Sequence, residues 1–305
     1  KIIVLAGGYS NERDVSLNSG LGICKALRER GHKAYLLDAF LGLPYDTDKL
    51  EEVFDLPDGG LGIASGIQIT EPDLDALWAS RPGDSKSYLG PNVLELCALA
   101  DITFFALHGN LGENGKLQAT FDVLGIRYTG PDSLGCALSM DKGVTKEIFK
   151  NQGVPTPAGT HLFRKDKDTP LSELGFSVPV VVKPCSGGSS IGVYIANTDE
   201  EYLDAIEKSF RKEDEVVIEP FIDGREYACG IVDGKALPLV EIVPKDGFFD
   251  YINKYQLGGA SEICPAQSLS AEQTAGIQAA GEKAFSALRL NVYSRADFIV
   301  DNHTG

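Results

Sequence analysis

A glycine- and serine-rich stretch, KPCSGGSSIG, follows an apolar run at residues 178–182. It begins at Lys183 and holds three glycines and three serines within ten residues. Glycine lets backbone N–H groups come close to a ligand and form an anion-binding concavity, so this loop could hold phosphate. Glycine and serine also favour ordinary hairpin turns, and the loop alone does not decide between the two interpretations.

Further polar clusters stand at the ends of predicted strands, where α/β proteins place their sites. Glu12 follows the first strand, and Ser10 or Asn11 is expected to cap the helix after it. Glu12 could also bind a substrate ammonium group. The other clusters are HGNLGENG from His108, EPFIDGRE at residues 219–226, and DYINKY at residues 250–255. A structural histidine and exposed turn acids are the ordinary alternatives for the first two of these.

Arg295 and Asp297 lie two residues apart in the apolar segment VYSRADFIV. Alternation along a strand places both on one face, opposite Phe298 and Val300. A charged pair on a mostly buried strand is costly unless it is paired or liganded. The pair is therefore either an internal salt bridge, or a carboxylate that binds Mg²⁺ beside an arginine that neutralises phosphate.

Several familiar sites are missing from the sequence. The Gly-Lys pairs at 115–116 and 234–235 are not followed by serine or threonine, which excludes a P-loop. The first strand ends in GGYSNERD instead of G-x-G-x-x-G, and G-x-S-x-G is also missing. The four histidines do not stand at metal-ligand spacing. Six scattered cysteines predict buried free thiols.

The elements that must position these clusters begin with a parallel α/β sheet. Apolar runs predict strands at residues 1–6, 34–38, 101–107 and 126–129. Between the first two, helical spacing relates Leu17, Leu21, Cys24 and Leu27. Residues 41–95 are turn-rich and acidic, and we expect a surface insertion or extra helix and strand pieces there.

The rest of the chain predicts antiparallel strands packed with helices. Helices are expected at residues 140–151, 198–212 and 271–288, the last with a capping box of Ser270 and Gln273. Strands are expected at residues 178–183, 191–195 and 215–221, and in REYACGIV, KALPLVEIV and VYSRADFIV. Asp233-Gly234 is a strong hairpin signal between REYACGIV and KALPLVEIV.

Composition limits the possible partners. The chain of 305 residues carries 28 Lys and Arg against 44 Asp and Glu, a net charge of −16. This acidic balance argues against nucleic acid, because binding its phosphate backbone needs a basic surface. The apolar runs are shorter than a membrane span, and the first residues do not resemble a signal peptide. We therefore expect a cytoplasmic protein without a membrane partner.

Taken in order, eight segments resemble the D-alanine–D-alanine ligases of the ATP-grasp superfamily. They are GGYSNERDVSLNSG, FFALHGNLGENGKLQ, YTGPDSLGCALSMDK, VVVKPCSGGSSIGV, IEPFIDGREY, KY at 254–255, CPA at 264–266, and SRADFIV. The resemblance implies an α/β protein, α+β in its central part, with a three-domain ATP-grasp fold. An N-terminal parallel-sheet domain would span 1–130, a central domain with the glycine-rich loop 131–218, and a shortened C-terminal domain 219–305.

The resemblance also implies how ATP is held. Lys142 and Lys183 would contact its phosphates, with the loop 185–190, including Ser189, closing over them. Glu219, Phe221 and Ile222 would border the adenine. Glu226 would bind the ribose, and Lys254 would lie on a mobile loop over the γ-phosphate. Asp297 would bind Mg²⁺ (or Mn²⁺), and Arg295 would stabilise the acyl phosphate and the tetrahedral intermediate.

For the amino-acid substrates, the resemblance implies that Glu12 holds the ammonium group of the first D-alanine, with His108 nearby. Ser189 and Tyr255 would join Glu12 in a hydrogen-bonded triad. The implied activity is an ATP-dependent ligase, working as a homodimer. It would join two D-alanines through a D-alanyl phosphate, and its product, D-alanyl-D-alanine, would serve peptidoglycan synthesis.

The C-terminal end departs from the family pattern. In the family a Glu-x-Asn pair supplies further Mg²⁺ ligands about a dozen residues after the aspartate. The sequence ends at Gly305, eight residues after Asp297, so a chain of this extent is expected to bind ATP weakly and to be a poor catalyst. Two alternatives stay open: a D-alanine–D-serine ligase and a non-catalytic ATP-binding relative. Tyr255 stands where users of D-lactate carry histidine, which favours an amine as the second substrate.

Overall fold

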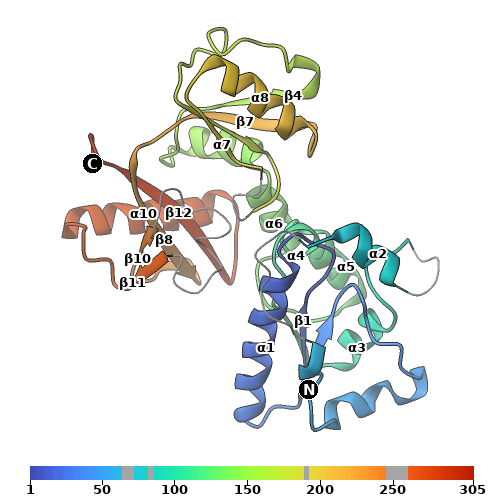
Figure 1. The fold of residues 1–305 in the computed structure, drawn as a ribbon. Helices are drawn as coiled ribbons and strands as arrows, with labels where there is room; N and C mark the ends of the chain where they lie inside the picture. Colours follow the sequence, from blue (N-terminus) through green and yellow to red (C-terminus); the bar gives the residue numbers. More distant parts are fainter. Residues whose placement is uncertain (64–71, 82–85, 189–191, 245–259) are drawn as a thin grey trace. The chain divides into compact units, whose positions relative to one another are not determined.

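The computed structural model describes residues 1–63, 72–81, 86–188, 192–244 and 260–305. Ser189, Lys254 and Tyr255, which were predicted to belong to the site, lie outside these ranges. The chain divides into two compact units, residues 1–133 and 134–305, and each is shown in Figure 1. The finer division into three domains stays a prediction.

The first unit is built on a parallel sheet with the strand order β2-β1-β3. β1 (Ile2–Ala6) pairs with β2 (Ala34–Asp38) on one side and with β3 (Ile102–Phe105) on the other. All of β2 is buried, as expected for a parallel strand covered on both faces. Helix α1 (Arg13–Glu29) covers one face and α3 (Val93–Leu99) lies on the other side (Figure 1).

Residues 41–95 contribute core instead of forming a surface insertion. Leu50, Val53 and Phe54 are buried with Ile3 and Leu5 on the face of the sheet opposite α1. The described elements of this segment are helical: η1 (Thr47–Asp55), η2 (Leu61–Ile63), α2 (Leu74–Ser80) and α3. The unit is completed by α4 (Asn110–Glu113) and α5 (Lys116–Leu124).

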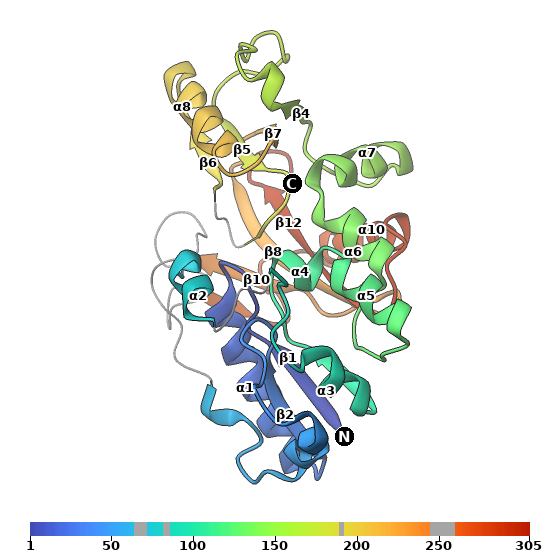
Figure 2. The same cartoon turned by 90° about the vertical axis from the view of Figure 1, so that its right-hand side faces the viewer.

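The second unit contains an antiparallel sheet with the order β4-β7-β5-β6. Its strands are β4 (Thr160–Phe163), β5 (Val180–Pro184), β6 (Tyr194–Ala196) and β7 (Glu215–Pro220). Helix α8 (Asp199–Phe210) covers one face of this sheet, as Figure 2 shows. Its Tyr202 and Phe210 pack with Val180, Val182 and Ile218. Helices α6 (Ser133–Met140) and α7 (Lys142–Gln152) precede this sheet, and η3 (Arg164–Asp166) follows β4.

A second antiparallel sheet in this unit has the order β11-β10-β8-β12, with β9 paired to β8. Its strands are β8 (Gly224–Val232), β9 (Lys235–Ala236), β10 (Val240–Pro244), β11 (Ala260–Ile263) and β12 (Tyr293–Asp301). Helix α10 (Ala271–Ala287) starts with the predicted capping box and packs on Tyr227, Cys229 and Ile231. Asp233 and Gly234 form the predicted turn, both with positive φ.

Three local predictions are wrong. Residues 126–129, predicted as a strand, form only an isolated bridge, in which Tyr128 pairs with Thr103 of β3. The segment KALPLVEIV is divided into β9 and β10, with Pro238, which has no N–H to donate to a ladder, in between. Five cysteines are buried free thiols, but Cys264 is exposed because it follows the end of β11.

None of the described helices combines the length with the apolar composition that a membrane span needs.

Candidate functional site

A buried ion pair holds the loop between β1 and α1. Arg13 Nη1 donates to Asp38 Oδ1 at 3.1 Å and to the Gly8 carbonyl at 3.0 Å, and Nη2 donates to Asp38 Oδ2. The two side chains are 10% and 4% exposed. Asp38 Oδ1 also accepts the N–H groups of Phe40 at 2.8 Å and Leu41 at 2.9 Å. Because Asp38 ends β2, the pair fixes this loop against the neighbouring strand.

The hydroxyl of Ser16 ties the same loop to the end of β3. Ser16 Oγ accepts the N–H of Gly7 at 2.8 Å and donates to the Ala106 carbonyl at 2.6 Å. The side chain is fully buried. The loops that follow β1 and β3 are therefore joined through one hydroxyl group.

Glu12 stands at the start of α1 and is only 8% exposed. The Ser10 hydroxyl accepts the Glu12 N–H at 3.1 Å, and the side chain of Glu12, the N-cap residue, makes no capping hydrogen bond. The expected cap by Ser10 or Asn11 is thus wrong, because Ser10 bonds to the N-cap residue itself. A Cβ at Gly109 would lie 2.5 Å from Glu12 Oε2, and Gly109 has a φ of 64°. The Glu12 carboxylate therefore lies against the loop after β3, in space that only glycine leaves free.

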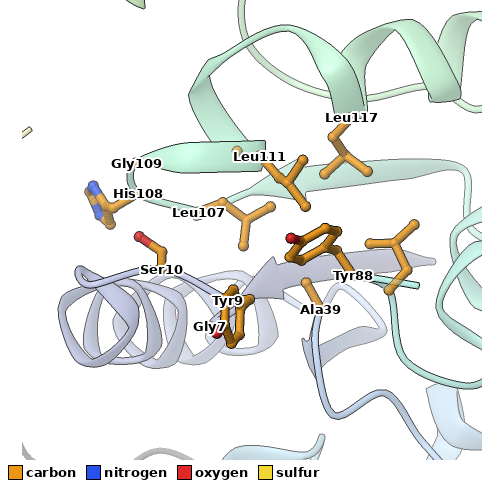
Figure 3. A pocket seen from close by; sticks show the side chains of 13 residues that line it. Gly7, Tyr9, Ser10, Ala39, Tyr88, Leu107, His108, Gly109, Leu111 and Leu117 are labelled. Atoms are coloured by element: carbon orange, nitrogen blue, oxygen red, sulfur yellow. The ribbon is translucent and has the colours of Figure 1, made fainter. Parts of the chain in front are cut away.

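That loop carries His108 and adjoins a small pocket (Figure 3). His108 Nε2 lies 3.3 Å from Ser19 Oγ on α1, and the Gly109 N–H donates to Glu113 Oε2 at 2.7 Å. The pocket is lined by residues of both loops and of the segment before α3, among them Tyr9, Ser10, Tyr88, Leu107, His108 and Gly109. The structure thus brings residues of the predicted Glu12 and His108 clusters together around a small pocket.

In the second unit, three charged side chains meet on the sheet face turned away from α8. Val181 pairs with Glu219 and Lys183 with Val217, so Lys183 and Glu219 are diagonal neighbours on one face. Lys146, from α7, donates to Glu219 Oε1 at 2.5 Å, and Lys183 forms an ion pair with Glu219 Oε2. The Lys146 and Glu219 side chains are 12% and 9% exposed. We call these three residues the lysine–glutamate cluster.

Gly159 makes room for this cluster. A Cβ at that position would lie 2.6 Å from Lys146 Cε and 2.9 Å from Glu219 Cγ. Burial acts to raise the pKa of Glu219, but Lys183 and Lys146 outweigh it and leave the pKa below its ordinary value. Glu219 is therefore a carboxylate held by two ammonium groups.

Replacing Glu219 with glutamine should remove part of the acid sensitivity of the second unit. Because the folded-state pKa is lowered, the carboxylate stabilises the fold above the unfolded pKa of about 4.5, and this contribution is lost as the pH falls through the folded pKa. Urea unfolding followed by circular dichroism from about pH 7 to about pH 3 should show a shallower decline for Glu219→Gln. Glu207→Gln, in an exposed pair on α8, is the control. Parallel pH profiles for wild type and Glu219→Gln would contradict this assignment.

Lys142 lies at the base of the glycine-rich loop. Its N–H donates to the Cys185 carbonyl at 2.9 Å, and its Nζ donates to the carbonyls of Gly187 at 2.9 Å and Cys185 at 3.3 Å. Burial, followed by the nearby Lys183 ammonium group, lowers the pKa of Lys142. The ammonium groups of Lys142 and Lys183 repel each other, and an anion bound between them would offset this repulsion. The glycine backbone beside them leaves room for such an anion.

The predicted adenine and ribose residues follow the same strand. Phe221 and Ile222 come directly after β7 and are half-buried, and the Phe221 N–H donates to the Pro179 carbonyl at 3.0 Å. Glu226 lies on β8, where Ala228, two residues on, pairs with Asp297 of β12. Directly paired residues share a face of the sheet, and so do residues two apart on one strand. Glu226 therefore lies on the same face as Ala228 and its partner Asp297.

Arg295 and Asp297 lie on one face of β12 and form an ion pair, as the alternation predicts. Arg295 Nε donates to Asp297 Oδ1 at 2.8 Å and Nη2 donates to Oδ2 at 3.1 Å. The prediction that this strand is mostly buried is wrong, because the side chains are 67% and 57% exposed while Phe298 and Val300 pack with α10. Accessible carboxylate oxygens are the donors that Mg²⁺ prefers, so Asp297 fits the predicted metal.

Sequence reasoning missed Arg13, Asp38 and Lys146. Asp38 could have been noticed, since it stands at the carboxyl end of a buried strand, where α/β sites form. Lys146 carries no local signal, because its role depends on which side of α7 faces the sheet. The predicted roles of Ser189, Lys254 and Tyr255 stay predictions, since these residues lie outside the described ranges.

Comparison with known proteins covers both units. Residues 1–131 match the family model described as D-ala D-ala ligase N-terminus, and residues 148–305 match D-ala D-ala ligase C-terminus. The D-alanine–D-alanine ligase of Lacticaseibacillus casei (strain BL23) is 39% identical over 303 residues, or 99% of this chain and 83% of that protein.

Two solved structures extend the comparison to the fold. The D-alanine–D-alanine ligase from Bacillus anthracis complexed with ATP has a TM-score of 0.70 and 29% identity, covering 99% of this chain and 82% of that one. The VanG D-Ala:D-Ser ligase from Enterococcus faecalis has a TM-score of 0.69 and 25% identity, covering 99% of this chain and 86% of that one. The predicted ATP-grasp fold is confirmed, and the chain belongs to the D-alanine–D-alanine ligase family.

Proposed function

We propose that the protein joins two D-alanine molecules at the expense of ATP, and that the D-alanyl-D-alanine it makes is used in peptidoglycan synthesis. The observation that carries this proposal is the position of Lys142 and Lys183 beside the glycine-rich loop, in a chain whose two units match this ligase family. Fixed ammonium groups at a glycine-rich loop are suited to the phosphates of ATP.

In the first step, a carboxylate oxygen of the first D-alanine attacks the γ-phosphorus of ATP. The bond from this phosphorus to the β–γ bridging oxygen breaks, ADP leaves, and a D-alanyl phosphate forms. Lys142 and Lys183 hold the phosphates and offset their charge, while Glu12 binds the ammonium group of the first D-alanine. Asp297 would hold Mg²⁺ or Mn²⁺, which would offset phosphate charge further, and Glu226, on the same face of the sheet, would bind the ribose.

In the second step, the amine of the second D-alanine attacks the carbonyl carbon of the acyl phosphate. The tetrahedral intermediate expels inorganic phosphate, the amine loses a proton, and the peptide bond remains. Arg295 neutralises the charge on the intermediate and the departing phosphate. Water would hydrolyse the acyl phosphate. Closure of the glycine-rich loop over the phosphates therefore serves to exclude water from the site.

The direct test is to incubate the full-length protein with Mg-ATP and D-alanine and to follow ADP, phosphate and dipeptide. D-Alanyl-D-alanine should form with one ADP released per dipeptide, as measured by mass spectrometry and a coupled ADP assay. Release of ADP that does not depend on D-alanine would contradict the ligase function.

A D-alanine–D-serine ligase is the second candidate, favoured by the likeness to the VanG D-Ala:D-Ser ligase. Competition between D-alanine and D-serine as second substrate distinguishes the two. If D-alanyl-D-serine dominates the products from an equimolar mixture, the second candidate is correct.

Replacing Glu12 with glutamine should raise the KM for D-alanine by roughly 10- to 100-fold, because a hydrogen bond to a charged group is worth about 1.5–3 kcal/mol. The KM for ATP should stay nearly unchanged. Glu29→Gln, at the exposed far end of α1, is the matched control. If Glu12→Gln has the KM of the wild type for D-alanine, Glu12 does not bind this substrate.

We further propose that the protein is a cytoplasmic homodimer. The need for ATP supports a cytoplasmic location, and the resemblance to the ligase family supports a homodimer. Light scattering coupled to size-exclusion chromatography should give a mass of two chains.

A further inference from the structure

Three side chains of metal-binding types converge at the edge of the lysine–glutamate cluster, and the proposed function uses none of them. They are His161 on β4, Cys185 just after β5, and Glu215 at the start of β7. One donor atom of each lies within 4.8 Å of the others, and His161 Nε2 is 2.9 Å from Glu215 Oε2. A nitrogen, a sulfur and an oxygen donor thus face one another.

The backbone of the sheet holds these positions. Glu215 pairs with Phe163 of β4, and its carbonyl accepts the Cys185 N–H at 3.1 Å. The neighbouring residues Pro184 and Val216 are paired in the β5–β7 ladder. An ion from solvent can reach the group, because the His161 and Glu215 side chains are 24% and 40% exposed, while Cys185 is buried.

We propose that His161, Cys185 and Glu215 form a binding site for a borderline-soft divalent cation of the Zn²⁺ class. Imidazole nitrogen, thiolate sulfur and carboxylate oxygen are the donors that Zn²⁺ takes in proteins, with water in the fourth tetrahedral position. Mg²⁺ selects oxygen ligands in an octahedral arrangement, so this site differs in chemistry from the one proposed at Asp297.

Nearby carboxylates favour a bound cation, whereas burial of the thiol and the Lys142 ammonium group oppose it. Burial, assisted by Asp141, raises the pKa of the Cys185 thiol to about 12, so the sulfur carries its proton when no metal is bound. On binding, the S–H bond breaks, a sulfur–metal bond forms, and the proton passes to solvent. The carboxylates of Asp141 and Glu213 add negative charge near the sulfur. The Lys142 ammonium group contacts the carbonyl of Cys185.

Co²⁺ titration of the full-length protein, without nucleotide and with a non-thiol reductant, tests the site independently of ligase activity. We expect one Co²⁺ to bind and to produce a thiolate-to-cobalt charge-transfer band in the near ultraviolet. Zn²⁺ added afterwards should abolish the band, whereas excess Mg²⁺ should leave it unchanged. A failure of the proposed ligase function would not affect this measurement.

Two variants and one control locate the ion. Cys185→Ala should lose the band, and His161→Gln should weaken Co²⁺ binding at least about tenfold, the size of effect seen when even an outer-shell partner of a metal is lost. Cys264→Ser removes the exposed thiol and should keep the band. The proposal is overturned if no saturable Co²⁺ band appears, if Cys264→Ser abolishes it, or if His161→Gln binds as tightly as the wild type. The His161→Gln result decides the matter should Cys185→Ala not fold.

Discussion

Replacing Asp38 with alanine is expected to lower the free energy of unfolding of residues 1–133 by about 3–5 kcal/mol, the usual cost of leaving one partner of a buried ion pair alone. Arg13 would keep its bond to the Gly8 carbonyl but would have no carboxylate beside it. The N–H groups of Phe40 and Leu41 would lose their acceptor as well. This is the largest stability effect that we expect from a single side chain of the first unit.

The single tryptophan allows the measurement to be confined to this unit. Trp78 packs against Tyr9 and Phe40, with ring centroids 5.2 and 5.3 Å apart, so its fluorescence reports on unfolding of residues 1–133. Urea titrations of wild type and Asp38→Ala should show the shift. Asp55→Ala, which breaks the exposed pair with Lys33, is the control and should change little. Equal effects of the two substitutions would show that burial of the Arg13–Asp38 pair has no energetic consequence.

Replacing Lys183 with methionine is expected to lower kcat/KM for ATP by about 10²- to 10³-fold, the effect of removing one fixed group that stabilises developing charge. Methionine keeps the length and the apolar part of the side chain. The fold should persist, because Lys146 still holds the Glu219 carboxylate after Lys183 is gone. The loss of activity therefore reports on ATP and not on unfolding.

Steady-state kinetics with varied ATP, together with circular dichroism, separate these two causes. Lys208→Met, which breaks an exposed pair on α8, is the control and should leave kcat/KM for ATP near the wild-type value. If Lys183→Met retains wild-type kcat/KM, Lys183 makes no contact with the phosphates and its role is to pair with Glu219.

Features that depend on neighbouring residues could be predicted from the sequence. The capping box of Ser270 and Gln273 and the turn at Asp233-Gly234 are both confirmed, because each is decided by a few adjacent side chains. Three of the four strands predicted for the parallel sheet, β1, β2 and β3, are also confirmed, since buried parallel strands have continuous apolar runs.

Features that depend on packing could not be predicted in this way. The lysine–glutamate cluster requires one side of α7 to face one side of a sheet, and helical periodicity does not say which lysine will then be buried. The exposure of Arg295 and Asp297 could not be predicted either, because an apolar segment does not show whether the opposite face of the strand is covered. The family resemblance supplied the candidate residues, and the fold shows which of them lie together.

The hydroxyl of Ser16 has a consequence for strand register. It bonds to Gly7, just beyond β1, and to Ala106, just beyond β3. If one of these two parallel strands slipped by a single residue along the other, a donor or an acceptor would move away and a buried polar group would lose its partner. Ser16, a residue of α1, thereby selects one register between β1 and β3, which no short turn connects. The same register fixes the position of the loop that carries Glu12 relative to the loop that carries His108.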